Sequence, residues 1–524
     1  MTDVIVIGGG LNGLIAAMWL ARRQYSVLVV ERQAQVGGAA VTEVTPKGFH
    51  RPTLSHAIGP LSQDVIRSLR LDRLPIEFLR PEPALTVLGH EQTAISFHRD
   101  HVLTAASIAR VSEADAGQWQ PFVDTMLRLS NVLVALNQRP APSVDDPATA
   151  DLWHLLKVGR RVRGLGRRDL ARLSRYLPIA VADLVAEWFE HDLTQTAVAA
   201  RGVFGHPVGP WSAGTGALLL QRVAEDPMPV GGGVTVKGGP GALTAALLAA
   251  ATDLGVQVRT GSEVTSVMTR GGSAVGVVLA SGEELPAHAV VSAIPPKTLL
   301  TQLVDPGDLP PVFRQRIGQV RSRGVTAKVN LSLDGLPEFP ALNGDAVPLS
   351  GRLLLAGSID ELERAHDAAK YGEVPGRPWI ELSLPSVIDT ALAPEGRHVL
   401  SAYVHNVPAS ADIDRDRVYA ATMAVLGEHA PDIDGLVLEH DVLTPADLES
   451  RWGLSGGHIF HGEGALDQWY AGRPLLGWAH HHATPVDGLF LASAGSHPGG
   501  GLTGQAGLNA ARVIATRLDK RRPW

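Results

Sequence analysis

Three glycines near the start of the chain have the spacing of a dinucleotide-binding turn. Gly8, Gly10 and Gly13 stand in VIVIGGGLNGL, between an apolar run that predicts a strand and residues that favour a helix. Glycines here permit a tight turn and a close approach of the backbone to a pyrophosphate, which the N–H groups at the helix start can bind. Glu31 follows about 20 residues on, where a carboxylate can accept hydrogen bonds from ribose hydroxyls. These residues predict a site for an adenine dinucleotide.

Two further glycine-rich pieces favour FAD over NAD. Gly37 and Gly38 in ERQAQVGGAA follow the acid closely, so a second tight turn can meet the same nucleotide, and Arg32 can lie along its ribose or adenine. Near the C-terminus, LFLASAGSHPGGGLTGQAGLNAARVI predicts a strand, a glycine-rich loop and a helix whose start can face a phosphate or a flavin. Two helix starts that converge on one long ligand suit FAD.

An α/β fold is needed to position these residues. The first turn lies inside a strand, helix, strand unit, and similar strands and helices recur in the middle of the chain and near its end. We predict a Rossmann-type FAD-binding domain assembled from residues 1–75, 226–300 and 471–524. Residues 76–225 and 301–470 have no comparable glycine turn, and we assign them to a second, mixed α+β substrate domain.

Composition narrows the class of protein. The 524 residues carry a net charge of -7, which gives no broad attraction to nucleic acid, so no nucleic-acid partner is expected. No stretch approaches the roughly 20 apolar residues of a membrane-spanning helix. An apolar strand begins at Val4 and leaves no room for a signal peptide, so we expect a cytoplasmic protein. The absence of cysteine excludes disulfides, thiol nucleophiles and a cysteinyl link to a flavin.

One local run of basic residues stands apart from this balance. Between residues 157 and 175, Lys157 and seven arginines are interleaved with apolar residues. A basic amphipathic segment of this kind can lie on an anionic membrane surface, which would place the protein at the inner face of a membrane. The alternative is a solvated helix pair that covers the substrate domain, because Gly159, Gly164 and Gly166 interrupt any single long helix.

The sequence resembles the phytoene desaturase-like branch of the FAD-dependent oxidoreductases. The resemblance rests on the two motifs at the start, on GGPGALTAAL and TGSEVTSV in the middle, and on ASAGSHPGGGLTGQAG at the end. GPWSAGTGALLL, AKVNLSLDGLPEFP and GGHIFHGEGALDQWY are similar to one subgroup, the pyridine nucleotide-disulphide oxidoreductase domain-containing protein 2 type. The resemblance implies a fold like that of glutathione reductase and amine oxidases, bound FAD, an apolar or mixed small-molecule substrate, and dehydrogenation, desaturation or isomerisation at carbon.

The residues predicted to contact a non-covalently bound FAD come from these motifs. They are Gly8, Gly10, Leu11, Asn12, Gly13, Glu31, Arg32, Gly37, Gly38, Ala39, Ala40, Val264, Gly495, Ser496, Gly501, Leu502 and Thr503.

Three residues are candidates for catalysis. By its place in the resembling motif, His497 should lie near the isoalloxazine, where it could take a proton; otherwise it only orders the glycine loop. Related flavin oxidases place a lysine near N5, which implies this position for Lys328, although a lysine on a strand is more often solvated or ion-paired. His56 in TLSHAIG falls in a segment that should approach the inner side of the flavin.

Histidine-rich stretches raise the question of a metal site. His458 and His461 stand near Glu463, and a histidine triplet covers 480–482. Consecutive side chains on a strand point to opposite faces, so the three histidines of the triplet cannot all bind one ion. The group of His458, His461 and Glu463 lacks a further ligand at the spacing of a metal site. We therefore expect no metal.

Three functions stay open at this point. The first is an FAD-dependent dehydrogenase, desaturase or isomerase that moves hydride between a substrate C–H bond and flavin N5. The second is an amine oxidase-like flavoprotein that uses oxygen. The third is a flavin-binding interaction protein with little turnover.

Overall fold

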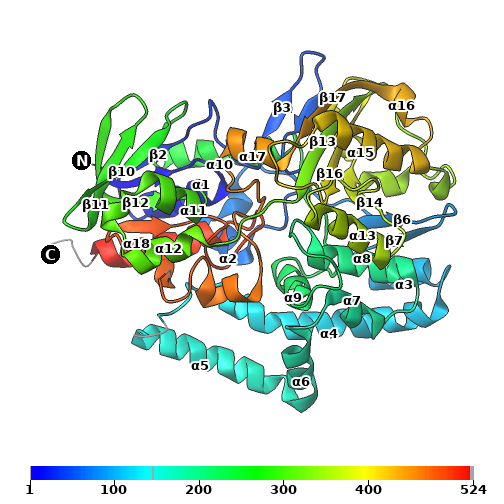
Figure 1. Ribbon diagram of the computed structural model, residues 1–524, viewed down its shortest axis with the longest axis horizontal. Coiled ribbons are helices and arrows are strands. Elements are labelled where there is room, and N and C mark those ends of the chain that lie inside the picture. The colour runs from blue at the N-terminus through cyan, green and yellow to red at the C-terminus, as the bar shows by residue number, and fades with distance from the viewer. Residues whose placement is uncertain (1, 144–146, 479, 520–524) are drawn as a thin grey trace.

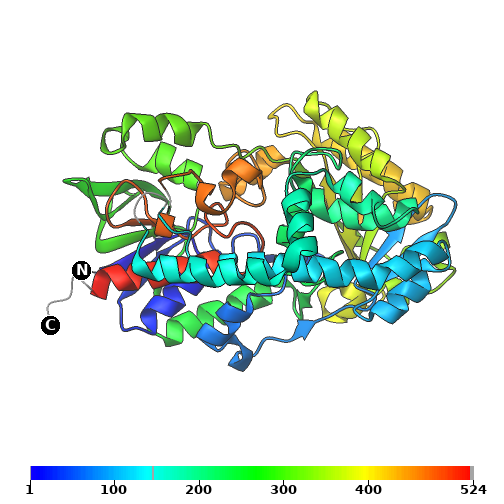
Figure 2. The same cartoon turned by 90° about the horizontal axis from the view of Figure 1, so that it is seen from below.

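Two seven-stranded sheets lie side by side in the computed structural model, which describes residues 2–143, 147–478 and 480–519 (Figure 1). The view from below has the same arrangement (Figure 2). One sheet has the parallel core of a Rossmann-type fold and the other is mixed. The fold class predicted from the sequence is confirmed.

The first sheet has the strand order β10-β11-β12-β1-β2-β9, with β18 paired to β12. Its parallel strands are β1 (Thr2–Ile7), β2 (Val27–Val30), β9 (Gln257–Arg259), β18 (Leu489–Leu491) and the second half of β12 (Glu284–Ser292). β10 (Val264–Arg270) and β11 (Ser273–Leu279) extend it as an antiparallel hairpin. Three separate stretches of the chain therefore build one sheet.

Burial on both faces explains the unbroken apolar sequence of β1. Val4 and Val6 pack on one face in a core with α1 (Leu11–Ala21), α10 (Pro240–Asp253) and α18 (Gln505–Asp519). Ile5 and Ile7 pack on the other face with side chains of the segment 299–320, which includes α12 (Pro311–Gly318). Strands of parallel sheets are typically buried in this way. The second segment of the substrate domain was expected to begin at residue 301, but side chains as far along the chain as Val320 pack in the core of the first sheet.

The second sheet has the order β17-β13-β16-β15-β14-β6-β7. Its strands are β6 (Leu85–Leu88), β7 (Ala94–Phe97), β13 (Thr326–Leu333), β14 (Arg352–Leu355), β15 (Ile380–Ser383), β16 (His398–His405) and β17 (Val437–Leu443). One face packs against α15 (Arg415–His429). The other packs against α4 (Glu113–Asn137), α8 (Asp192–Val203) and α9 (Thr215–Glu225).

Further elements complete the fold. They are β3 (Thr42–Val44), β4 (His50–Pro52), β5 (Phe78–Leu79), β8 (Thr235–Val236), α2 (Gln63–Leu69), α3 (His101–Ile108), α7 (Val181–Ala186), α11 (Pro296–Thr298), α13 (Ile359–Lys370), α14 (Pro385–Ile388), α16 (Ile433–Leu436) and α17 (Pro445–Trp452).

The basic run forms two consecutive helices, α5 (Thr149–Gly164) and α6 (Gly166–Tyr176). In Figure 1, α5 lies below the body of the molecule, next to α6, and its Asp151 pairs with His481 of the body. Only Val158 of α5 is buried. Across the described ranges, the helices are each too short or too polar to traverse a lipid bilayer.

Candidate active site

A cavity of about 450 Å³ takes its walls from elements of both sheets. The nucleotide side of the cavity is lined by the first glycine turn, the end of β2, residues 54–60 and the loop before α18. The charged side includes Lys328, Arg352 and Glu381 from the second sheet, together with residues of α8 and α9. Its volume lies within the range of small-molecule and cofactor sites.

The first glycine turn has the geometry that its sequence predicts. Gly8 has a φ of +95°, and a Cβ on Gly13 would lie 2.1 Å from the carbonyl oxygen of Gly8, so only glycine allows the helix to pack on the turn. Gly10 precedes α1 without a side-chain cap, which leaves the first N–H groups of the helix free of such a partner. A Cβ on Gly10 would meet only the Cα of Gly38, at 3.8 Å, and would otherwise project into the cavity.

Glu31 lies at the end of β2 and is largely buried in the cavity wall. Its carboxylate accepts hydrogen bonds from the N–H groups of Gly9 and Gln33, at 2.7 and 2.8 Å. Each oxygen keeps a further lone pair, so the carboxylate can also accept ribose hydroxyls. The neighbouring Arg32 lines the same cavity, and its guanidinium donates to the carbonyl oxygen of Arg451.

The starts of α1 and α18 contact each other at the cavity. The N–H of Gly507 donates to the side chain of Asn12 at 3.2 Å, and a Cβ on Gly507 would lie 2.2 Å from the carbonyl oxygen of Asn12. Gly501 and Thr503, in the loop before α18, line the cavity. The three glycine-rich pieces of the sequence thus meet around one space.

Most of the predicted cofactor residues line this cavity. They are Gly8, Gly10, Leu11, Asn12, Glu31, Arg32, Gly38, Ala39, Val264, Gly501, Leu502 and Thr503. The remaining five lie outside the cavity lining: Gly13, Gly37, Ala40, Gly495 and Ser496. Gly13 and Gly495 hold neighbouring segments close together, since a Cβ on Gly495 would lie 2.3 Å from Pro296.

Lys328, on the charged side of the cavity, pairs with His56, which is buried and does not itself line the cavity. Lys328 lines the cavity from β13, and its Nζ lies 2.9 Å from Nδ1 of His56 and 4.1 Å from the centre of the Tyr403 ring. Burial lowers the pKa of Lys328 well below its ordinary value. Burial, with the charge of Lys328, lowers the pKa of His56 to about 3. Burial therefore disfavours the charged form of both groups, and His56 is neutral at neutral pH.

Glu381 lies behind His56 and is held by an arginine. Its Oε1 is 3.9 Å from Nε2 of His56, and its Oε2 accepts from Arg352 at 2.7 Å. Burial by itself would raise the pKa of Glu381, but the charge of Arg352 and the interactions with His56 and His405 together outweigh burial, and the pKa falls to about 2. A histidine that accepts from Lys328 through Nδ1 carries its proton on Nε2, which faces this carboxylate.

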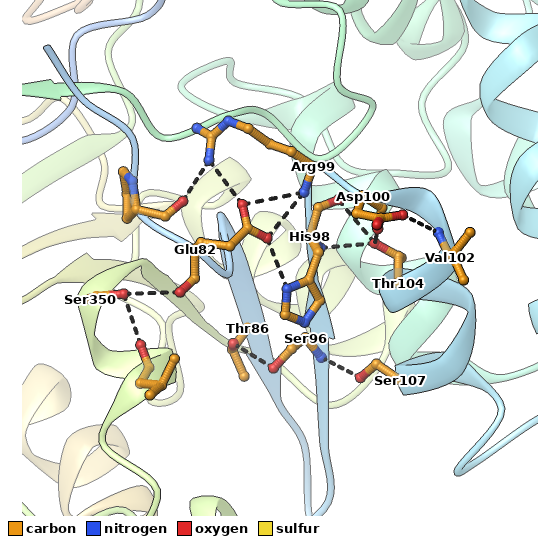
Figure 3. Close-up of polar contacts among 12 residues, drawn as sticks. Glu82, Thr86, Ser96, His98, Arg99, Asp100, Val102, Thr104, Ser107 and Ser350 are labelled. Atoms are coloured by element: carbon orange, nitrogen blue, oxygen red, sulfur yellow. Dashed lines mark hydrogen bonds and ion pairs between the residues drawn. The ribbon is translucent and has the colours of Figure 1, made fainter.

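The loop 226–233 lies at the charged side of the cavity, and two arginines hold it by hydrogen bonds to its carbonyl oxygens. Arg352 donates to the carbonyl oxygens of Val230 and Gly231 at 2.7 and 2.6 Å. Arg99 donates to the carbonyl oxygen of Gly232, and Glu82 in turn binds Arg99 and His98 (Figure 3). The polar network at Glu82 thereby positions a loop that lines the cavity.

His497 does not line the cavity. Its Nε2 lies 3.0 Å from the carbonyl oxygen of Leu136 in α4, and the edge of its ring faces Tyr470. Burial lowers the pKa of His497 to about 3. The structure thus places His497 apart from Lys328 and His56, in the position of a residue that orders its loop.

The histidine-rich stretches make separate contacts. Nδ1 of His458 accepts from the N–H of Phe460, His481 pairs with Asp151, and His482 bonds the carbonyl oxygen of Leu491. Within the described residues, no three metal-binding side chains gather closely enough to hold an ion.

Several charged residues of the site escaped the sequence analysis. Arg473 is buried and donates to carbonyl oxygens in two motifs, at Phe460 and at Ala494. Arg352 and Glu381 line the cavity from the second sheet. A signal for both was present, because each is a single charge inside an apolar strand, in GRLLLAG and WIELSL.

Comparison with known proteins places this geometry in context. Residues 11–515 match the family model described as flavin containing amine oxidoreductase. The pyridine nucleotide-disulfide oxidoreductase domain-containing protein 2 of Rattus norvegicus is 32% identical over 98% of this chain and 93% of its own length. The phytoene desaturase (neurosporene-forming) of Rhodobacter capsulatus is 26% identical over 96% of this chain and 91% of its own length. Both relatives confirm the resemblance that the motifs indicated.

A solved structure gives the same fold. Cyclohexylamine oxidase from Brevibacterium oxydans aligns with a TM-score of 0.61 over 99% of each chain, at 18% sequence identity.

Proposed function

Because the chain belongs to the family of flavin-containing amine oxidoreductases, we propose that it holds FAD non-covalently in the cavity and dehydrogenates an organic substrate there. When bound, FAD would accept a hydride from a substrate C–H bond at flavin N5. The protein then has to orient the substrate, exclude water and receive the accompanying proton. The single observation that carries the proposal is a buried lysine amine in the wall of a cavity that begins at the dinucleotide turn.

The residues of the nucleotide side fit FAD. The first N–H groups of α1 would hold the pyrophosphate, and Glu31 would accept the ribose hydroxyls. The space next to Gly10 is free of protein atoms where a side chain would project. Gly501 and Thr503 would lie along another part of the same ligand, since they share the cavity with the first turn.

Lys328 is the residue suited to receive the proton. A neutral amine can accept a proton, and burial lowers the pKa of Lys328, which favours its neutral form. The ring of Tyr403 and the carboxylate of Glu381 would then stabilise the new ammonium charge. His56 holds the amine in place at 2.9 Å, so we assign it a positioning role.

The charged side favours a mixed substrate over a wholly apolar one. Leu54, Phe204 and Ile459 provide apolar wall. Arg201 also lines the cavity, and its nearest acidic partner is Asp226, at 3.7 Å. The Nε–H of Arg201 is buried without a hydrogen-bond partner among the described residues, so a substrate with an apolar body and an acidic or other hydrogen-bond-accepting group would fit this side.

The test begins with the absorbance spectrum of purified protein. A flavin spectrum, with all the FAD released into solution by acid denaturation, is expected for non-covalent binding. Anaerobic mixing with separate pools of apolar-chain acids, amines and polyenes should bleach the flavin with one class. Failure to take up FAD, even after reconstitution, would contradict the proposal.

The same experiment discriminates the other functions. Bleaching by amines, followed by peroxide release in air, would favour an amine oxidase-like flavoprotein. Bound FAD that no pool reduces would favour a flavin-binding interaction protein.

A further inference from the structure

Helices α5 and α6, here called the basic arm (residues 149–176), leave large apolar side chains in water. Leu152, Trp153 and Leu156 are 53%, 60% and 46% exposed, and Leu170 is 42% exposed. These side chains stand on a segment that lies apart from the two sheets (Figure 1). Exposed leucines that cluster with a tryptophan on one helix are unusual on a surface that only meets water.

The same arm carries positive charge without acidic partners. Six exposed cations have no ion pair with any described residue: Lys157, Arg160, Arg161, Arg163, Arg167 and Arg168. Arg172 and Arg175, at the end next to the body of the protein, do pair with Asp169 and Glu187. The uncompensated charge is therefore confined to the outer part of the arm, in a chain whose net charge is -7.

We propose that the basic arm binds the surface of membranes that contain anionic phospholipids. Tryptophan and leucine side chains enter the boundary between head groups and acyl chains, while lysine and arginine bind lipid phosphates. A nucleic acid would engage the cations but give Leu152 and Leu156 no apolar partner. A second copy of the arm would bring like charges together. An anionic lipid surface complements both features at once.

The proposal concerns docking and is independent of the proposed chemistry. No residue of the arm lines the cavity described above. The arm contacts the FAD-side polypeptide through Asp151, which pairs with His481 at 2.9 Å. Binding through the arm would thus fix the protein at a membrane while the cavity keeps its walls.

Cosedimentation of the full-length protein with vesicles tests this inference. Vesicles of phosphatidylcholine mixed with phosphatidylglycerol should bind the protein, and vesicles of phosphatidylcholine alone should bind it weakly. Raised salt should release the protein from the mixed vesicles, because it screens the charges. Absence of binding to the mixed vesicles, or equal binding to both kinds, overturns the proposal, as does preferential binding to double-stranded DNA.

Variants then locate the binding surface. The double change Arg160→Gln with Arg167→Gln should weaken binding by about 25-fold, since each cation near an anionic surface is worth about fivefold. The double change Trp153→Ser with Leu156→Ser should weaken it on the order of tenfold. Tyr371→Ser is the matched control, because Tyr371 is 80% exposed outside the arm. Unchanged binding by both arm variants, or an equal loss in the control, overturns the proposal.

Discussion

The nucleotide side and the charged side of the cavity use different parts of the polypeptide. The nucleotide side depends on close approach to the backbone, with glycines at Gly8, Gly10 and Gly38 and with the N–H groups at the start of α1. The charged side consists of buried ionisable side chains, held in pairs such as Arg352 with Glu381. A backbone site is damaged by adding atoms, whereas a paired site is damaged by removing them. The following predictions test this difference.

Removal of one partner from the charged side should have the largest effect. Arg352→Met leaves the buried carboxylate of Glu381 without its cation and should lower the free energy of unfolding by about 3–5 kcal/mol. Chemical denaturation measures the change, and the added substitution Glu381→Leu should recover most of it. Arg259→Met, which breaks an exposed pair with Glu283, should have a much smaller effect, because solvent screens the pair. An equal loss in the two single variants would contradict the assignment.

Removal of the amine from the cavity wall should slow chemistry and spare cofactor binding. Lys328→Met should reduce the rate of anaerobic flavin reduction by about 100- to 10,000-fold, the usual range for loss of a general base. Its FAD content should stay normal, because Lys328 lies on the charged side. Stopped-flow absorbance measures the rate, with Lys370→Met as a control on the protein surface. Unchanged reduction in Lys328→Met would exclude it as the proton acceptor.

Addition of a side chain to the nucleotide side should weaken cofactor binding and leave the protein folded. Gly10→Val places a side chain in the space for the pyrophosphate and should weaken FAD retention by about 100-fold. The folded apoprotein should persist, since the nearest protein atom to a Cβ there is 3.8 Å away. Flavin content and circular dichroism measure the two effects. Gly117→Val, in α4 with no neighbour near its Cβ position, is the control. Normal flavin content in Gly10→Val would defeat the cofactor assignment.

Lowering the pH should lower the free energy of unfolding through His56, the histidine that pairs with Lys328. The pKa of His56 falls from 6.5 to about 3 on folding because of burial, so the unfolded chain binds a proton more readily between these values. The stability from this group is complete above pH 6.5 and is lost as pH falls toward 3. By pH 5 the loss should be on the order of 1–2 kcal/mol. Denaturation midpoints at pH 7 and 5 measure it, and a fall of the same size in His56→Gln would contradict this origin.

His497 should have the smallest effect on chemistry. Because its ring contacts α4 and lies outside the cavity lining, His497→Ala should keep FAD and reduce it at a rate within about twofold of the wild type. Stopped-flow absorbance under anaerobic conditions measures the rate of flavin reduction. A large loss of rate with normal FAD content would show that His497 takes part in catalysis.

The difference between the two sides also explains what the sequence could predict. The turn at Gly8 to Gly13 and the acid at Glu31 are close in sequence, so strand, turn and helix could be identified from local patterns. The pair of Arg352 with Glu381 joins two strands of the second sheet, and no local pattern records which charges meet. Lys328 was identified only through the family resemblance. His497 stands in a cofactor motif, yet its side chain packs toward α4, because a motif constrains backbone more tightly than side-chain direction.

The parallel sheet has a consequence for the order of events during synthesis. β1 is made first, but β18 pairs with β12 beside it, and α18 contacts α1 at Asn12. A ribosome therefore releases the glycine turn long before it makes the segment that completes the opposite wall. The wall of the cavity is complete only after translation has passed residue 507, so binding of the proposed flavin would follow synthesis of nearly the whole chain.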